Sequence, residues 1–225
     1  MLGTQKLLAV ITGGSGYIGG AIVREFEKHG WQTANLSRSS KEYPCDITDE
    51  KNTVVAVKKI VEALGNISAC IHAAHPNESN GLDSLKSSLA VAESGANHLA
   101  RAAESHMAAN GAFIGITTQL IEEGLRSPQG GAYIESKKAL RAFLRDLARE
   151  WSSKGLRVYA VAPGYLPGGL NKDVPKAVIE MLAKKTSKTH QTVEGVAKLV
   201  VRIADGKAFP SGTSILVDGE VVSPL

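Results

Sequence analysis

The sequence predicts an α/β fold in which one parallel sheet carries helices on both faces, the doubly wound arrangement. Two observations lead to this prediction. Short apolar runs alternate along the chain with longer segments of helical periodicity. A glycine-rich turn also follows directly on the first apolar run, where such a fold passes from its first strand into its first helix. The 225 residues contain no visible linker or repeat, so residues 1–225 are expected to form a single domain.

Continuous apolar runs are typical of strands that are buried on both faces of a sheet. Such runs lie at residues 7–11 and 67–74. Residues 33–36, 112–116, 156–161 and 214–217 are also predicted to be strands, and we expect about seven strands in all. Helices are predicted where apolar residues recur every three or four positions. The segments with this spacing are 18–30, 49–65, 82–110 and 132–153. Asp49 is expected to cap the second helix, and the third is expected to break near Gly95.

Composition excludes several classes of protein. The chain is 43% hydrophobic and 21% charged, which is typical of a soluble globular protein. No apolar run reaches the ~18 residues of a membrane span. The two cysteines, Cys45 and Cys70, lack metal-ligand spacing and predict neither a disulfide framework nor a metal site. The net charge of +4 is scattered along the chain, which argues against a nucleic acid partner. We expect a cytoplasmic protein that is not attached to a membrane.

The glycine-rich turn is the first candidate site. Four glycines lie where the first predicted strand passes into the first predicted helix, at positions 13, 14, 16 and 19. Glycines allow the backbone to turn tightly and to approach a pyrophosphate, which then rests on the helix N-terminus. We therefore expect a dinucleotide to be bound by Gly13, Ser15, Gly16, Tyr17, Ile18 and Gly19. The alternative is a tight strand-to-helix turn that binds no ligand, but such a turn would hardly need four glycines.

The end of the second predicted strand indicates which nicotinamide cofactor is preferred. An acidic residue there contacts the ribose hydroxyls of NAD, whereas a basic residue accommodates the 2′-phosphate of NADP. This strand ends in Ser37 and Arg38, without a carboxylate. NADP(H) is favoured over NAD(H), because these two side chains could hold a phosphate by charge-assisted hydrogen bonds. The alternative is that Arg38 is a solvent-exposed loop residue that binds no phosphate.

A second candidate site lies at the start of the last long helix. The spacing of four between Tyr133 and Lys137 places both side chains on one helix face, one turn apart. A lysine ammonium beside a phenol favours the phenolate and is expected to lower the pKa of the tyrosine. Lowering that pKa from ~10 to neutrality requires about 4 kcal/mol. The pair is therefore a candidate for acid–base catalysis.

Seven segments follow one another in an informative order. They are residues 12–19, 45–49, 71–75 and 117–118, the pair Tyr133 and Lys137, and residues 162–164 and 212–219. This succession resembles the short-chain dehydrogenase/reductase family over nearly the whole chain. The resemblance implies a Rossmann fold and hydride transfer between NADP(H) and a small-molecule carbonyl or alcohol, with a ketone reductase favoured. It also implies a homodimer or homotetramer.

The resemblance assigns roles residue by residue. Tyr133 would be the general acid, Lys137 its partner that also holds the nicotinamide ribose, and Thr118 the hydroxyl that orients the carbonyl. Thr117 is the reserve for that last role. The implied cofactor contacts beyond the glycine turn are Ser37, Arg38, Asp46, Ile47, Ala73, Ala74, His75, Tyr133, Lys137, Pro163, Gly164 and Leu166.

Departures from the family pattern leave other functions open. Ala92 stands where the family has a catalytic asparagine, and residues 72–75 read His-Ala-Ala-His instead of Asn-Asn-Ala-Gly. Both favour a catalytically impaired NAD(P)-binding sensor or scaffold, whereas the retained tyrosine–lysine pair favours an enzyme. Thr118 precedes Tyr133 by fifteen residues, two more than is usual. The glycine spacing is closer to the family's extended branch of epimerases and dehydratases, but 225 residues leave no room for the substrate domain of that branch.

Overall fold

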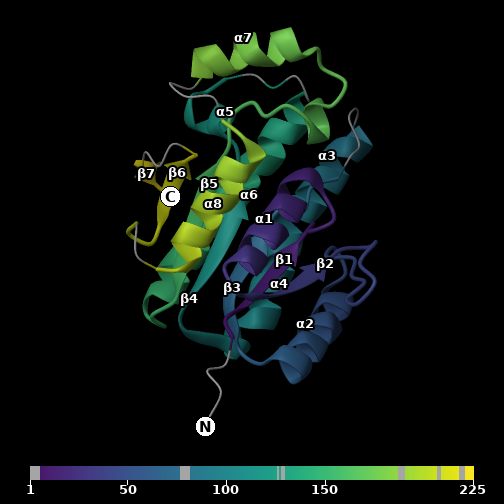
Figure 1. Cartoon of the computed structure of the whole chain (residues 1–225), viewed down its shortest axis with the longest axis vertical. Coiled ribbons are helices and arrows are strands. Elements are labelled where there is room, and N and C mark those ends of the chain that lie inside the picture. Colours follow the sequence, from purple (N-terminus) through teal and green to yellow (C-terminus); the bar gives the residue numbers. More distant parts are fainter. Residues whose placement is uncertain are drawn as a thin grey trace.

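The computed structural model describes residues 6–76, 82–125, 127, 130–186, 191–206, 209–217 and 221–225. Within these residues seven strands form one sheet in the order β2-β1-β3-β4-β5-β6-β7 (Figure 1). The strands are β1 (Leu8–Thr12), β2 (Gln32–Leu36), β3 (Ile67–His72), β4 (Met107–Ile116), β5 (Arg157–Ala162), β6 (Thr213–Leu216) and β7 (Val221–Pro224). All neighbours are parallel except β6 and β7. The predicted doubly wound α/β fold is confirmed, with an antiparallel edge strand that no apolar run indicated.

The described residues also form eight α-helices and three short turns of other helix types. They are α1 (Tyr17–Lys28), α2 (Glu50–Leu64), α3 (Leu82–Leu89), the π-helix η1 (Ala90–Ser94), α4 (Gly95–Ala103), the 3₁₀ helix η2 (Glu104–His106), α5 (Gln119–Glu122), α6 (Gly131–Ser152), the 3₁₀ helix η3 (Gly169–Asn171), α7 (Lys176–Thr186) and α8 (Val193–Ala204). The side chain of Asp49 caps α2 as predicted, because it accepts a hydrogen bond from the N–H of Asn52.

One predicted helix is too long. Residues 82–110 have a helical pattern throughout, but helical structure ends at residue 106 and β4 begins at Met107. Met107 pairs with Ile67 of β3, so strand pairing over a long range outweighs the local pattern. The break predicted near Gly95 takes the form of the π turn η1, which directly precedes α4.

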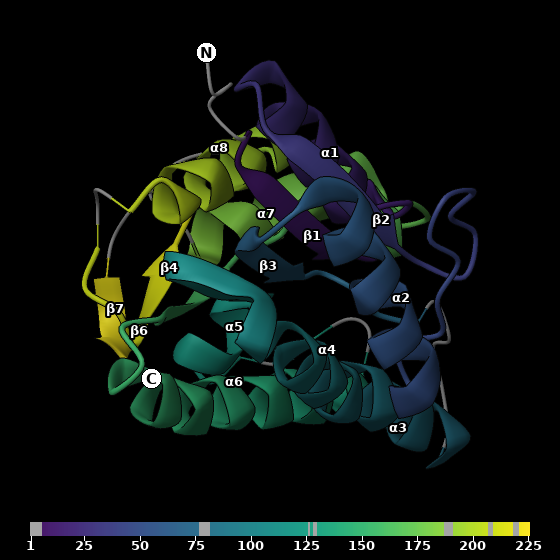
Figure 2. The same cartoon turned by 90° about the horizontal axis from the view of Figure 1, so that it is seen from below.

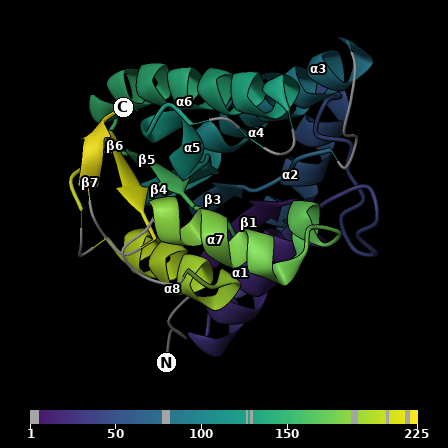
Figure 3. The ribbon, with the colours of Figure 1, turned by 90° about the horizontal axis from the view of Figure 1, so that it is seen from above.

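Helices cover both faces of the sheet and produce three layers (Figure 2, Figure 3). α2, α4 and α6 lie on one face, and α1 and α8 lie on the other. Successive residues of β1 alternate between the two faces. Leu8 and Val10 belong to the core under the first set of helices, and Ala9 and Ile11 belong to the core under the second. Burial on both faces explains the continuous apolar runs of the strands.

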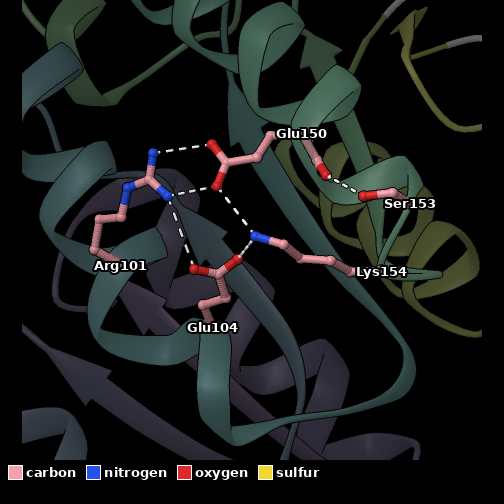
Figure 4. Close-up of polar contacts among 5 residues, drawn as sticks. All are labelled: Arg101, Glu104, Glu150, Ser153 and Lys154. Atoms are coloured by element: carbon pink, nitrogen blue, oxygen red, sulfur yellow. Dashed lines mark hydrogen bonds and ion pairs between the residues drawn. The ribbon is translucent and has the colours of Figure 1, made fainter.

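An ion-pair network joins α4 to the end of α6 (Figure 4). Arg101 on α4 donates to both carboxylate oxygens of Glu150 on α6, at 2.6 and 2.9 Å. Lys154, just beyond α6, donates to Glu150 at 3.1 Å and also to Glu104. Arg101 and Lys154 hold the pKa of Glu150 down at about 2. Because these side chains are partly solvent-exposed, the network orients the two helices more than it stabilises the fold.

The carboxyl ends of the parallel strands all lie at one edge of the sheet (Figure 1). α7 lies beyond this edge. The strand order reverses between β1 and β3, and ligands of doubly wound sheets bind at such a reversal. Among the described residues, no helix is both long enough and apolar enough to cross a membrane.

Candidate active site

A cavity of about 790 Å³ opens at this edge of the sheet. Its walls come from the glycine turn, the ends of β2, β3 and β4, the start of α6 and the loop after β5. The predicted site residues that line it are Gly13, Ser15, Gly16, Tyr17, Ile18, Gly19, Ser37, Arg38, Asp46, Ile47, Ala73, Ala74, His75, Tyr133, Lys137, Pro163, Gly164 and Leu166. The remaining predicted residue, Thr118, is buried beside the cavity, whose lining includes Thr117 instead.

Close packing of the backbone explains the glycines of the turn. Gly13 has a φ of +70°, and a Cβ on it would lie 2.7 Å from the Cα of Ala74. A Cβ on Gly19 would lie only 2.1 Å from the carbonyl oxygen of Gly13. The N–H of Gly13 donates to the carbonyl of Leu36 at 3.0 Å, which ties the turn to β2. The turn therefore brings bare backbone and the N-terminus of α1 to the cavity wall, an arrangement that suits a pyrophosphate.

Polar side chains surround the end of β2. The Oγ atoms of Ser15 and Ser37 share a hydrogen bond at 2.8 Å, and the amide of Asn35 donates to Ser15 at 2.9 Å. Arg38 is exposed and lines the cavity beside them. One cation and two hydroxyls thus gather where a 2′-phosphate is expected, and no carboxylate lies on this strand end.

Asp46 and Ile47 continue the same wall. The carboxylate of Asp46 accepts from the hydroxyl and the N–H of Thr48, at 2.7 and 3.0 Å, and these bonds hold the pKa of Asp46 below its ordinary value. The charge of Arg38 lowers this pKa further. Ile47 is buried, and its carbonyl accepts from Nδ1 of His98 at 3.0 Å. Both residues are therefore held in place by groups of the protein itself.

Tyr133 and Lys137 reach the cavity from the first two turns of α6. Nζ of Lys137 lies 5.7 Å from the centre of the Tyr133 ring and donates to the carbonyl of Ile116 at 2.8 Å. Burial lowers the pKa of Lys137 to about 8. Burial also raises the pKa of Tyr133, and a hydrogen bond with Thr118 opposes this rise. In the protein alone the pKa of Tyr133 therefore lies above its ordinary value and not below it, and Lys137 is not among the causes of the shift.

The two threonines after β4 make different contacts. Thr118 caps α5, donates to the carbonyl of Pro163 at 3.4 Å and bonds to the side chain of Tyr133. The hydroxyl of Thr117 donates to the carbonyl of Val161 at 3.2 Å, and this residue lines the cavity. Thr118 thus lies against the tyrosine, as its predicted role requires, while Thr117 is the one that borders the open space.

His75 brings an imidazole into contact with Tyr133. The two ring centres are 5.2 Å apart and the rings are nearly perpendicular, at 88°. Burial, and next the charge of Lys137, lower the pKa of His75 to about 3, so the ring is neutral. Its Nδ1 atom is buried and has no hydrogen-bond partner among the described residues. An orphaned buried nitrogen in a cavity wall fits a site that a ligand completes.

Two glutamines outside any motif hold the loop after β5. The N–H of Gly164 donates to Oε1 of Gln191 at 2.7 Å, and the amide of Gln191 donates to Oε1 of Gln119 at 3.2 Å. The N–H of Gln119 donates in turn to the carbonyl of Pro163 at 2.9 Å. The two glutamines are 72 positions apart, so no local pattern in the sequence could have revealed them.

Tyr17 also makes a contact between segments that are far apart in the sequence. Its hydroxyl donates to the carbonyl of Pro167. Gly168 and Gly169 have φ values of +102° and +56°, and Cβ atoms on them would lie 2.9 and 3.1 Å from the Tyr17 side chain. Residues 167–169, which we call the strap, therefore lie against the tyrosine of the glycine turn. Tyr17, Gly168 and Gly169 all line the cavity, so the strap forms part of its wall.

The described residues contain no group of three or more histidine, cysteine, aspartate or glutamate side chains that could hold a metal ion. Cys45 and Cys70 are both buried free thiols.

A glycine turn and a tyrosine–lysine pair around one cavity of a doubly wound sheet define a class of oxidoreductases. The family model described as enoyl-(acyl carrier protein) reductase matches residues 16–220. The chain belongs to the short-chain dehydrogenase/reductase family.

Individual relatives agree with this assignment. Short-chain dehydrogenase reductase 4 of Arabidopsis thaliana is 28% identical over 243 residues, covering 94% of this chain and 81% of the relative. A blue fluorescent protein from a metagenomic library, solved in complex with NADPH, is 26% identical with a TM-score of 0.81, over 95% of this chain and 96% of the other. The 3-oxoacyl-[acyl-carrier protein] reductase of Brucella melitensis, solved with NAD, has a TM-score of 0.84 over 99% and 100% of the two chains. At 21% identity this last likeness shows the fold alone.

Proposed function

We propose that the protein is an NADPH-dependent reductase of small-molecule ketones, able to oxidise the matching alcohol in the reverse direction. The observation that carries this proposal is the meeting of the glycine turn, Arg38 and the Tyr133–Lys137 pair around one cavity. When bound, the nicotinamide would supply or accept the hydride. A similar protein that was solved with NADPH supports the choice of cofactor.

The chain's own residues would hold the cofactor along the cavity. The backbone of residues 13–19 would bind the pyrophosphate, and Arg38 with Ser37 would bind the 2′-phosphate. Asp46 and Ile47 would border the adenine. The nicotinamide end would lie near Tyr133, between Ala73, Ala74 and His75 on one side and Pro163, Gly164 and Leu166 on the other. Nδ1 of His75 would then find the hydrogen-bond partner that it lacks among the described residues.

Tyr133 would donate a proton from its hydroxyl to the carbonyl oxygen of the substrate. Its pKa is raised by burial, so the group is a neutral phenol and carries the proton it has to give. Thr118 bonds to Tyr133 and would orient both the phenol and the carbonyl oxygen. Lys137 is buried with a pKa of about 8, so it can hold or release a proton close to neutral pH and so resupply the tyrosine.

A titration followed by a turnover screen tests this proposal. Purified protein is titrated with NADPH and with NADH by fluorescence, and a panel of ketones is then screened through the loss of nicotinamide absorbance at about 340 nm. We expect tighter binding of NADPH and turnover with one class of ketone. If neither cofactor binds, the proposal is wrong, beginning with the assignment of the glycine turn as a dinucleotide-binding site.

Buried Ala92 favours a second function, an NAD(P)-binding sensor or scaffold without turnover, because no side-chain amide is present at this position. Tight cofactor binding without turnover across the whole panel would support it.

As part of the main proposal, the enzyme is cytoplasmic and forms a homodimer or homotetramer. Light scattering of the purified protein measures the oligomeric state, and a monomer at micromolar concentration would contradict that part.

A further inference from the structure

A buried carboxylate joins four elements beside the cavity. Oε1 of Glu122, the last residue of α5, accepts from Nε of Arg141 on α6 at 3.0 Å and from Oγ of Ser214 on β6 at 2.7 Å. Arg141 also donates through Nη2 to the carbonyl of Pro224 on β7 at 3.2 Å. The Glu122 side chain is only 5% exposed, and Ser214 is fully buried. One carboxylate and one guanidinium therefore connect α5, α6, β6 and β7.

α5 begins at the threonine that the proposed mechanism uses. The hydroxyl of Thr118 accepts from the N–H of Leu120 at 3.4 Å and so caps α5. A helix of four residues is too short to be stable by itself, so its position depends on the tertiary contacts that it makes. Any displacement of α5 therefore also displaces the Thr118 hydroxyl.

Arg141 lies on the face of α6 that carries the tyrosine–lysine pair. Tyr133, Lys137 and Arg141 follow one another at intervals of four residues, which places their side chains on one helix face. α5 lies against this helix (Figure 2, Figure 3). Arg141 therefore holds the end of α5 one turn beyond Lys137.

We propose that Glu122 is a positioning residue, whose bond with Arg141 sets the distance between the Thr118 and Tyr133 side chains. Thr118 precedes Tyr133 by fifteen residues, so the chain between them does not fix that distance. Leu120 of α5 belongs to the apolar cluster against which Tyr133 packs, but apolar contacts have no preferred direction. The effect of Glu122 on turnover rests on the proposed function, whereas the anchoring of α5 does not.

Stability alone is a weak reason to bury this ion pair. The cost of removing charged groups from water offsets much of their attraction, and apolar side chains of similar volume often stabilise a fold equally well. Charge-assisted hydrogen bonds differ from apolar packing because they fix distance and direction. Glu122 and Arg141 are not among the described residues that line the cavity, so their bond acts on the site through α5 and α6.

An apolar replacement of the whole cluster separates positioning from stability. The triple variant Glu122→Met, Arg141→Met and Ser214→Ala removes both charges and the hydroxyl together, so we expect its midpoint of urea unfolding to stay close to that of wild type. Arg145→Met, which removes an exposed cation from the same helix, is the matched control. If the triple variant does not fold, as circular dichroism would show, Glu122→Gln takes its place, because it keeps the shape of the side chain and loses only the charge.

Hydrogen exchange of the full chain without ligand tests whether the cluster anchors α5. The segment to be measured is residues 117–125, whose amides make the hydrogen bonds of α5 and its two ends. We expect at least about tenfold faster exchange there in the triple variant, about threefold in Glu122→Gln, and wild-type exchange in Arg145→Met. Unchanged exchange in the triple variant, or in Glu122→Gln where that variant replaces it, would overturn the proposal whatever the turnover.

Turnover and cofactor affinity test the link to the reaction. We expect kcat to fall by about tenfold to a hundredfold in the triple variant, because the Thr118 hydroxyl is displaced from Tyr133. NADPH affinity should stay within about threefold, since the cluster lies outside the cavity lining. Wild-type kcat despite faster exchange, or equal losses of kcat and NADPH affinity, would contradict the positioning role. If the wild type reduces no ketone, the proposed function fails, and the exchange result alone decides whether Glu122 anchors α5.

Discussion

Lys137 lies beside Tyr133 without bonding to its hydroxyl: the ammonium is 5.7 Å from the centre of the phenol ring and donates instead to the carbonyl of Ile116. Burial is the largest influence on both groups. It lowers the pKa of the lysine to about 8 and raises that of the tyrosine. In the protein alone the pair is therefore arranged to donate a proton from a neutral phenol rather than to hold a phenolate.

Replacing Tyr133 by phenylalanine is expected to reduce carbonyl reduction by about 10²- to 10⁴-fold, because the proton donor is lost. NADPH affinity should remain within a few-fold, since the ring is kept. Steady-state kinetics and a fluorescence titration measure the two quantities. Tyr165→Phe is the matched control, because Tyr165 is also buried and packs near Tyr133. Undiminished turnover in Tyr133→Phe would remove the residue from the acid role.

Arg38→Asp is expected to weaken NADPH binding by at least about tenfold relative to NADH, because a carboxylate repels the 2′-phosphate and accepts from ribose hydroxyls. Titrations with both cofactors at the same ionic strength measure the ratio. Arg24→Asp, on the exposed side of α1, controls for the change in net charge. An unchanged ratio in Arg38→Asp would mean that other groups hold the phosphate.

The stability of the protein is expected to rise between about pH 8 and pH 10.5 through Lys137. Its folded pKa is about 8 and its ordinary value is 10.5, so in this window the unfolded chain binds a proton that the folded chain has released. The full shift corresponds to roughly 3 kcal/mol. Urea unfolding at pH 8 and pH 10 measures it, in wild type and in Lys137→Met. An equal rise in the variant would assign the effect to other groups.

Acid is expected to destabilise the protein through His72 and His75. Both have pKa values lowered to about 3 by burial and by Lys137, so between pH 6.5 and 3 the unfolded chain takes up protons that the folded chain excludes. Each histidine contributes about 1.4 kcal/mol per pH unit in this range. His75→Gln should make the loss of stability between pH 6.5 and 4.5 less steep. The same slope in the variant and in wild type would show that His75 is protonated when folded.

Tyr17→Phe is expected to speed the dissociation of NADPH by about two- to tenfold. The change removes the hydrogen bond to the carbonyl of Pro167, worth about 0.5–1.5 kcal/mol, and so loosens the strap in the wall of the cavity. Stopped-flow displacement measures the rate. Tyr43→Phe, a tyrosine outside the cavity lining, is the control. A dissociation rate unchanged in Tyr17→Phe would show that the strap does not retain the cofactor.

Much of the fold follows from local patterns. The strand-like segments of the sequence marked six of the seven strands, and the four glycines marked the first strand-to-helix turn. The errors lie where local pattern and long-range pairing disagree. Residues 104–110 have a helical pattern, yet β4 begins at Met107 because it pairs with Ile67, forty positions away. β7 is a short antiparallel edge strand, Val221–Pro224, whose sequence ends in serine and proline and therefore contains no continuous apolar run.

The sequence by itself determined the fold class, the glycine turn, the basic end of β2 and the spacing that puts Tyr133 and Lys137 on one helix face. The last three depend on residues within about one turn or one strand of one another, so local geometry is enough. The fold class follows from the order of such local patterns along the chain. Only the tertiary structure decided which threonine faces the tyrosine, the hydrogen bond from Ser214 to Glu122 across 92 positions and the contact of Tyr17 with Pro167 across 150. It also reversed the expected pKa shift of Tyr133, because desolvation depends on everything packed around a group and not on its neighbours along the chain.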